Sequence, residues 1–180
     1  VPWGPKRMVP DATKVRDGRA NPRGIAYLYL STSKETVMHE VRPWAGSVLS
    51  TAVFQTTKEQ KLVDFSILSG EEHPPISLPQ LFEKPTEDQI KKDVWISIDN
   101  AFSKPVSNNE DPTKYIPTQI LAELVKRDGY DGIAYKSVFS NGFNIVLFDV
   151  NAASLISCAM YNATDVNISF CKENGIYAEY

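Results

Sequence analysis

Cysteine and histidine are scarce in this chain of 180 residues, which has two of each. Cys158 and Cys171 lie in apolar segments near the end of the chain. We expect two free thiols of a cytoplasmic protein, with a disulfide as the open alternative. His39 and His73 are far apart and have no cysteine or histidine at ligand spacing. We therefore expect no metal site.

Long apolar runs are also missing, and none approaches the roughly 20 residues that a membrane-spanning helix needs. No signal-peptide pattern is present. Because the chain begins with Val1 and not Met, we expect it to be either a trimmed chain or part of a longer protein. The net charge is −3 and the basic residues are dispersed, which argues against a nucleic-acid binder. Neither a Gly-x-Gly-x-x-Gly motif nor a phosphate-binding Gly-Lys-Ser/Thr loop occurs.

The remaining composition is that of an ordinary globular domain. We predict one domain over residues 1–180, with loop insertions at 69–86 and 103–115. The predicted class is α+β, a mixed and mostly antiparallel β core with about three helices. Predicted helices lie at 32–42, 88–102 and 117–128. Predicted strands lie at 25–31, 47–55, 61–65, 133–136, 143–148, 155–161 and 166–170.

Local signals support these boundaries. The first 24 residues are rich in proline, glycine and basic residues, which predicts a loop and not a helix. Thr32 and Glu35 have capping-box spacing, and Asn141-Gly142 predicts a hairpin. Pro117 and Gly129 suit the start and the end of one helix. The apolar faces expected for the two longer helices are Ile90, Val94, Trp95 and Ile98, and Ile120, Leu121, Leu124 and Val125.

A few polar residues at element ends could form an anion and sugar site. Arg19 could bind a pyrophosphate or a carboxylate through two parallel hydrogen bonds, with Asn21 holding its loop. Tyr29 could stack on a nucleotide ring, and Ser137 could bind a ribose, a phosphate or an amide. From spacing alone, a surface arginine, a core tyrosine, a solvated Glu40 and a strand-end serine remain alternatives.

Two blocks of the sequence together resemble the RES domain family, which is named for Arg, Glu and Ser. The first block runs from Gly18-Arg19-x-Asn21-Pro22 through Tyr27-Leu28-Tyr29-Leu30-Ser31 to Glu40-Val41-Arg42-Pro43. The second comprises Tyr115-x-Pro117-Thr118-Gln119, Gly129-Tyr130-Asp131-Gly132-Ile133, Tyr135-x-Ser137 and Gly142-x-Asn144-Ile145. Toxin members often have tryptophan where this chain has Ala20, which indicates a different subfamily.

The resemblance implies an ADP-ribosyltransferase-like fold and a toxin or growth-inhibiting effector that cleaves NAD by hydrolysis or phosphorolysis. NAD is then the substrate, and no cofactor is needed. The implied catalytic residues are Glu40, Arg19 and Tyr29. The implied substrate-binding residues are Arg19, Tyr29, Ser137 and Asn144. An antitoxin or immunity protein is an implied partner. The alternatives are an ADP-ribosyltransferase with a protein acceptor, and a non-enzymatic nucleotide- or partner-binding module.

Overall fold

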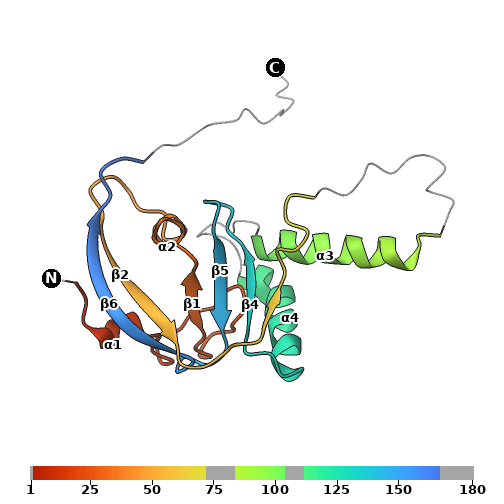
Figure 1. Ribbon diagram of the computed structural model, residues 1–180, viewed down its shortest axis with the longest axis horizontal. Coiled ribbons are helices and arrows are strands. Elements are labelled where there is room, and N and C mark those ends of the chain that lie inside the picture. Colours follow the sequence, from red (N-terminus) through yellow and green to blue (C-terminus); the bar gives the residue numbers. More distant parts are fainter. Residues whose placement is uncertain (1, 72–83, 104–111, 167–180) are drawn as a thin grey trace, which may run out of the picture.

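The structure is a computed structural model, and it describes residues 2–71, 84–103 and 112–166. Helices and strands are mixed along the chain, and the predicted α+β class is confirmed (Figure 1). The elements are α1 (Pro5–Met8), β1 (Leu28–Ser31), α2 (Lys34–Glu40), β2 (Val48–Thr56), β3 (Leu62–Asp64), α3 (Glu87–Ser103), the 3₁₀ helix η2 (Pro112–Tyr115), α4 (Ile116–Arg127), β4 (Gly132–Lys136), β5 (Phe143–Leu147) and β6 (Ala153–Asn162).

A four-stranded sheet with the order β1-β5-β4-β3 forms the centre of the fold. Strands β1 and β4 both pair antiparallel with β5, whereas β3 pairs parallel with β4. The predicted hairpin thus joins β4 to β5. Asn141-Gly142 closes a loop that begins at Ser137, so it is not a two-residue turn. Strands β2 and β6 form a separate antiparallel ribbon with an irregularity between Val53 and Phe54.

Alternation along the strands gives the central sheet two apolar faces. One face packs against α3 and α4 through a core that includes Phe65, Phe102, Ile133, Val146 and Phe148. The other face packs through Leu28, Leu147 and their neighbours against Ala153 of β6 and Phe54 of β2. The helices and the ribbon therefore cover opposite faces of one sheet, because successive side chains of a strand point to opposite sides.

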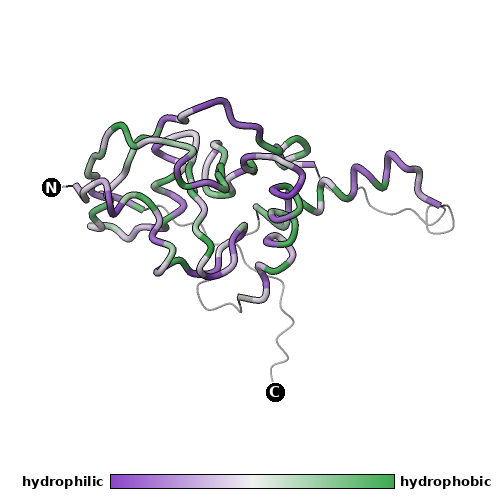
Figure 2. The backbone as a smooth tube through the Cα atoms, turned by 90° about the horizontal axis from the view of Figure 1, so that it is seen from below, coloured by the Kyte–Doolittle hydropathy of each residue, from purple (hydrophilic) through white to green (hydrophobic). Residues whose placement is uncertain are grey.

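The apolar faces predicted for the two long helices are only half right. Trp95 and Ile98 of α3 pack on the core, but Ile90 and Val94 are about half exposed. The beginning of α3 projects beyond the sheet, so its early apolar residues have nothing to cover (Figures 1 and 2). On α4, similarly, Leu121 and Val125 are in the core, whereas Ile120 (56% exposed) and Leu124 face outward.

Three further local predictions need correction. The opening segment contains the short helix α1, which starts at Pro5, a residue suited to a first turn. Helix α2 is capped by Ser33 and not by Thr32, because the Ser33 hydroxyl accepts from the Thr36 amide at 3.1 Å. Strand β1 begins at Leu28, three positions after the predicted start at 25.

Several expectations touch residues that the structure does not describe. Cys158 is a free thiol, and its predicted companion Cys171 lies outside the described residues, as do His73 and residues 167–170 of the last predicted strand. Most of the loops predicted at 69–86 and 103–115 lies there too. Among the described helices, none combines the length and the apolar character needed to cross a bilayer.

Candidate functional site

Polar side chains gather at one end of the sheet face that α3 and α4 cover. Ser31 of β1 pairs with Asn144 of β5, which pairs in turn with Tyr135 of β4. Residues paired across neighbouring strands point to the same face. One step along the strands, Tyr29, Val146 and Ile133 form the next row of this face. The face therefore changes from an apolar core to a row of hydroxyl and amide groups within a few residues.

Glu40 reaches this polar row from the last position of α2. Its Oε1 accepts one hydrogen bond from Asn144 Nδ2 at 2.6 Å and another from Ser137 Oγ at 2.8 Å. Both donors belong to buried residues, and Asn144 is itself held by the Ser31 hydroxyl, which donates to its Oδ1 at 2.7 Å. The described residues donate nothing to Oε2. The described residues therefore fix the carboxylate through one of its two oxygens.

The first turn of α2 is held against the β4–β5 loop by a close approach of two small residues. Thr36 is fully buried, and its hydroxyl accepts from Ser140 Oγ at 2.7 Å. At Gly142 a Cβ atom would collide with the Thr36 hydroxyl. Ser137 lies in the same loop, with its amide bonded to the Gly142 carbonyl at 3.1 Å. The glycine of the predicted hairpin therefore matters for docking α2, and so for placing Glu40 beside Ser137.

Arg19 lies in a loop that is held from several sides. Asn21 is buried, and its Nδ2 donates to the carbonyls of Arg16 and Pro22, which confirms its predicted structural role. Gln119 of α4 donates to the carbonyls of Gly18 and Asn21, both at 3.0 Å. A Cβ atom at Gly18 would lie only 2.5 Å from Asn21 Oδ1, so this position has no room for a side chain.

Tyr29 connects the sheet to the Arg19 loop through its hydroxyl. The hydroxyl donates to Asn21 Oδ1 at 2.7 Å and accepts from the Ala20 amide at 3.0 Å. Desolvation raises the pKa of Tyr29 to about 12, although the Ala20 amide and the charge of Arg19 act in the opposite direction. The residue is nevertheless 40% exposed. Its hydroxyl is therefore engaged by protein while the residue as a whole keeps exposed surface.

The guanidinium of Arg19 is oriented by the end of α3. Its Nη1 donates to the backbone carbonyl of Phe102, the only acceptor it has among the described residues. The remaining N–H groups can therefore serve a ligand. Tyr135 packs on Phe102, whose carbonyl accepts from Arg19, and pairs across the sheet with Asn144, which donates to Glu40. Burial raises the pKa of Tyr135, while the charge of Arg19 lowers it and that of Glu40 raises it further. The two blocks of the sequence thus meet around Tyr135.

The five predicted site residues fall into two groups. Glu40, Ser137 and Asn144 form one hydrogen-bonded group, and Tyr29 belongs to the loop that carries Arg19. Ser31, Tyr115 and Tyr135 were missed as site neighbours. Tyr115 lies at the start of α4 and raises the pKa of both Tyr29 and Tyr135. Strand alternation between Tyr29 and Ser31 could have indicated Ser31, since both point to one face.

His39 lies beside Glu40 in sequence but takes no part in the cluster. Its Nδ1 is 2.6 Å from the Glu35 carbonyl one turn earlier in α2, and its side chain is exposed. The described ranges contain no group of three or more His, Cys, Asp and Glu residues that could hold a metal ion. The chemistry available in this part of the molecule is therefore that of a carboxylate, a guanidinium, hydroxyls and an amide.

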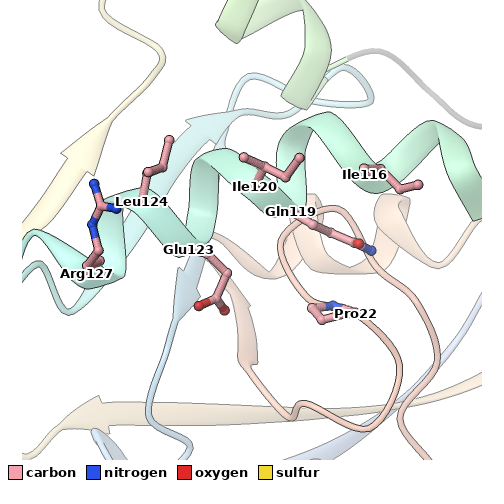
Figure 3. Close-up of a pocket in the computed structure, with 7 residues that line it drawn as sticks. All are labelled: Pro22, Ile116, Gln119, Ile120, Glu123, Leu124 and Arg127. Carbon is pink, nitrogen blue, oxygen red and sulfur yellow. The ribbon is translucent and has the colours of Figure 1, made fainter.

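A separate groove of about 490 Å³ runs along the outer face of α4 (Figure 3). It is lined by Pro22, Ile116, Gln119, Ile120, Glu123, Leu124 and Arg127. None of the five predicted site residues lines it. Gln119 and Pro22 nevertheless connect it to the loop of Arg19, since Gln119 holds the backbone of that loop.

Comparison with known proteins gives one match. The family model described as RES domain matches residues 5–169 of the 180-residue chain. No curated protein and no solved structure matches the chain. The matched range includes both halves of the site, from the Arg19 loop to the strand that carries Asn144.

Proposed function

Since the chain belongs to the RES domain family, we propose that it is an enzyme that cleaves the nicotinamide–ribose bond of NAD. The observation that carries the proposal is the Glu40 carboxylate, fixed at Oε1 by Ser137 and Asn144 with Oε2 left over. Such a group can stabilise positive charge that develops on a sugar without first having to reorganise.

The reaction needs little acid–base chemistry at the leaving group. Cleavage of the bond gives the ribose an oxocarbenium character, and nicotinamide leaves as a neutral molecule. In hydrolysis, water adds its oxygen to the ribose carbon, releases a proton and gives ADP-ribose. In phosphorolysis, a phosphate oxygen takes that place. In both cases Glu40 Oε2 would face the ribose and its hydroxyls, where a negative charge is worth most in the transition state.

Arg19 and Tyr29 supply the remaining contacts of the proposal. A guanidinium with free N–H groups matches the geometry of a pyrophosphate, which it can bind through two parallel hydrogen bonds. The ring of Tyr29 is held by its hydroxyl and stays partly exposed, so one aromatic face is available to stack on nicotinamide. Ser137 and Asn144 act through Glu40, by holding its carboxylate in one orientation.

Loss of NAD would stop growth in a cell that held the active enzyme. We therefore also propose that the protein is a toxin or effector of the cytoplasm, and that an antitoxin or immunity protein neutralises it. This part of the proposal rests on the family and on the NAD-consuming activity.

The decisive experiment is incubation of purified protein with NAD, with and without phosphate, followed by chromatography of the products. We expect nicotinamide together with ADP-ribose or a phosphorylated ADP-ribose. Label transferred from adenine-labelled NAD to a protein in cell extract would instead identify an ADP-ribosyltransferase. Absence of nicotinamide release under all of these conditions would refute the NAD-consuming activity.

Glu40→Gln is the matched variant for this experiment. Both donors bind the same carboxylate oxygen, so the carbonyl of glutamine can keep both hydrogen bonds while the charge is lost. We expect turnover to fall by about 10²–10³-fold, the usual effect of removing an electrostatic group of this kind. NAD affinity should change little, because the charge acts mainly in the transition state. Near-normal turnover in the folded variant would show that Glu40 has no catalytic role.

A further inference from the structure

Tyr135 lies at the centre of the site, and nothing in the proposed reaction uses it so far. It pairs with Asn144 across the sheet, and Ser137 follows it by two positions, directly after the end of β4. Its side chain is 5% exposed. Its ring packs against Phe102 at 5.6 Å between centroids, and Phe102 supplies the carbonyl that accepts from Arg19. Tyr135 therefore connects the two halves of the site.

The hydroxyl of Tyr135 differs from those of its two neighbours on the sheet face. Tyr27 donates to Glu123 at 2.5 Å and accepts from Lys126, and Tyr29 has two partners in the Arg19 loop. Tyr135 has no hydrogen-bond partner among the described residues. Buried tyrosine hydroxyls usually have one, so this hydroxyl needs an explanation.

The hydroxyl also reaches open space. In the described part of the chain, Gln60 Oε1 is the side-chain polar atom that is fully buried and has no hydrogen-bond partner. The Tyr135 hydroxyl also lacks a partner, but it is not fully buried. The hydroxyl is therefore not fully enclosed by protein, although its residue is buried. Burial raises the pKa of Tyr135, with further increases from Tyr29 and Glu40, so the hydroxyl keeps its proton near neutral pH and can act as a donor.

The position of this donor indicates which part of a substrate it would meet. Glu40 on one side suits the nicotinamide ribose, and Arg19 on the other suits the pyrophosphate. Of the two phosphates in that pyrophosphate, the one esterified to the nicotinamide ribose is the nearer to the ribose. We propose that the Tyr135 hydroxyl donates a hydrogen bond to this phosphate, an inference that rests on the proposed function of the site.

The test compares ligands with and without that phosphate. Tyr135→Phe removes the hydroxyl and keeps the ring. Calorimetry would measure binding of nicotinamide mononucleotide and of nicotinamide riboside in a Glu40→Gln background, so that neither ligand is consumed. Binding of ADP-ribose to the chain with Glu40 intact is a second measurement. We expect Tyr135→Phe to weaken binding of the mononucleotide and of ADP-ribose about 10–100-fold, and of the riboside less than about twofold.

Tyr27→Phe is the matched control, because Tyr27 lies on the same face but bonds to α4 and not to the site. It should leave all three affinities unchanged and should lower the melting temperature through the loss of its two hydrogen bonds. Tyr135→Phe should leave the melting temperature unchanged or raise it, since no internal bond is lost.

The outcomes separate this inference from the proposed function. If neither ADP-ribose nor nicotinamide mononucleotide binds to the protein with Tyr135 intact, the proposed function fails, and the inference fails with it. If both bind and Tyr135→Phe binds them equally well, only the inference is wrong. Equal weakening of mononucleotide and riboside would place the hydroxyl on a group other than the phosphate. A melting temperature that falls as in Tyr27→Phe would show an internal partner and would also overturn the inference.

Discussion

At the scale of single residues, the site consists of a few polar groups whose neighbours determine what they can do. Asn144 uses both ends of its amide, since it accepts from Ser31 and donates to Glu40. Ser137 donates to the same carboxylate oxygen. Glu40 therefore has one carboxylate oxygen that accepts two hydrogen bonds from the protein and one that accepts none from the described residues. The same residue types with a different pairing would leave a carboxylate that rotates and stabilises no particular charge.

Asn144→Ala tests this arrangement directly. The variant removes one of the two donors to Glu40 and leaves the Ser31 hydroxyl without its partner. We expect turnover to fall by about tenfold or more while the KM for NAD stays within a few-fold, because the change disturbs the orientation of a group that acts in the transition state. Steady-state kinetics beside circular dichroism would measure both. A rise in KM at constant kcat would instead indicate that Asn144 binds substrate directly.

At the scale of the elements, helices α3 and α4 both bury only part of their apolar side chains. Both helices have apolar residues on two neighbouring faces, and the sheet covers only one of them. On α4 the exposed face lines the groove of Figure 3, beside the loop that carries Arg19. The opposite face builds the core below the site. The two faces therefore predict different effects of mutation.

Leu121 and Leu124 of α4 provide a matched pair. Leu121→Ala removes a side chain that packs on the core and should lower the free energy of unfolding by about 2–3 kcal/mol, the lower part of the range for such truncations. Leu124→Ala changes a residue that is 39% exposed and should cost less than about 1 kcal/mol. Urea unfolding of both variants would measure the difference. If both variants lost the same free energy of unfolding, the outer face of α4 would have to be buried against another part of the protein.

Asp99 of α3 gives a prediction about pH. It is buried, and desolvation raises its pKa above the ordinary value of 3.8 despite a hydrogen bond from Ser103. The folded state therefore holds this proton more tightly than the unfolded state. The contribution of Asp99 to stability is fully present below pH 3.8 and is lost as pH rises through the folded-state pKa.

Asp99→Asn removes the cost of burying a charge and keeps an oxygen that can accept from Ser103. We expect a higher melting temperature than the parent at pH 7 and no gain at pH 3, measured by calorimetry at both values. Asp88→Asn on the same helix is the control, because that side chain is 96% exposed and its loss should change stability little. A gain from Asp99→Asn that was equal at both pH values would rule out ionisation as its cause.

At the scale of the whole molecule, the site depends on contacts between parts that are distant in sequence. The sheet brings β1 beside β5, the β4–β5 loop packs on α2, and Gln119 of α4 holds the Arg19 loop. The apolar core below the site lies between the central sheet and helices α3 and α4. A ligand that touches both Arg19 and Glu40 should therefore stabilise the entire fold, since it joins segments that separate on unfolding.

Thermal unfolding with NAD tests this expectation. In the Glu40→Gln chain, which should not consume its substrate, NAD at 100 times its Kd should add about 2.7 kcal/mol to the free energy of unfolding. Adding Arg19→Ala removes a charge-assisted contact worth about 1.5–3 kcal/mol, so most of the gain at that NAD concentration should disappear. The melting temperature as a function of NAD concentration is the measurement. A gain that is the same with and without Arg19 would show that Arg19 does not bind NAD.

The sequence by itself determined the elements and the family, for reasons that are local. Strand alternation, Pro117, Gly129 and the pair Asn141-Gly142 act over a few residues, and each appears in the structure near its predicted place. The combination of motifs around Arg19, Glu40 and Ser137 resembled the RES domain, and the family model confirms that membership. The spacing of apolar residues along α3 and α4 could not show which helix face packs on the sheet, because that depends on how far the sheet extends beneath each helix.

Only the tertiary structure decided how the site residues meet. Ser137 and Asn144 share one oxygen of Glu40, Arg19 is oriented by the carbonyl of Phe102, and Tyr135 packs on the ring of Phe102. Each of these contacts joins residues that are far apart in sequence. No local pattern encodes such contacts. They follow from the register of β1, β5 and β4 and from the close packing of Thr36 on Gly142, which together fix where each side chain points.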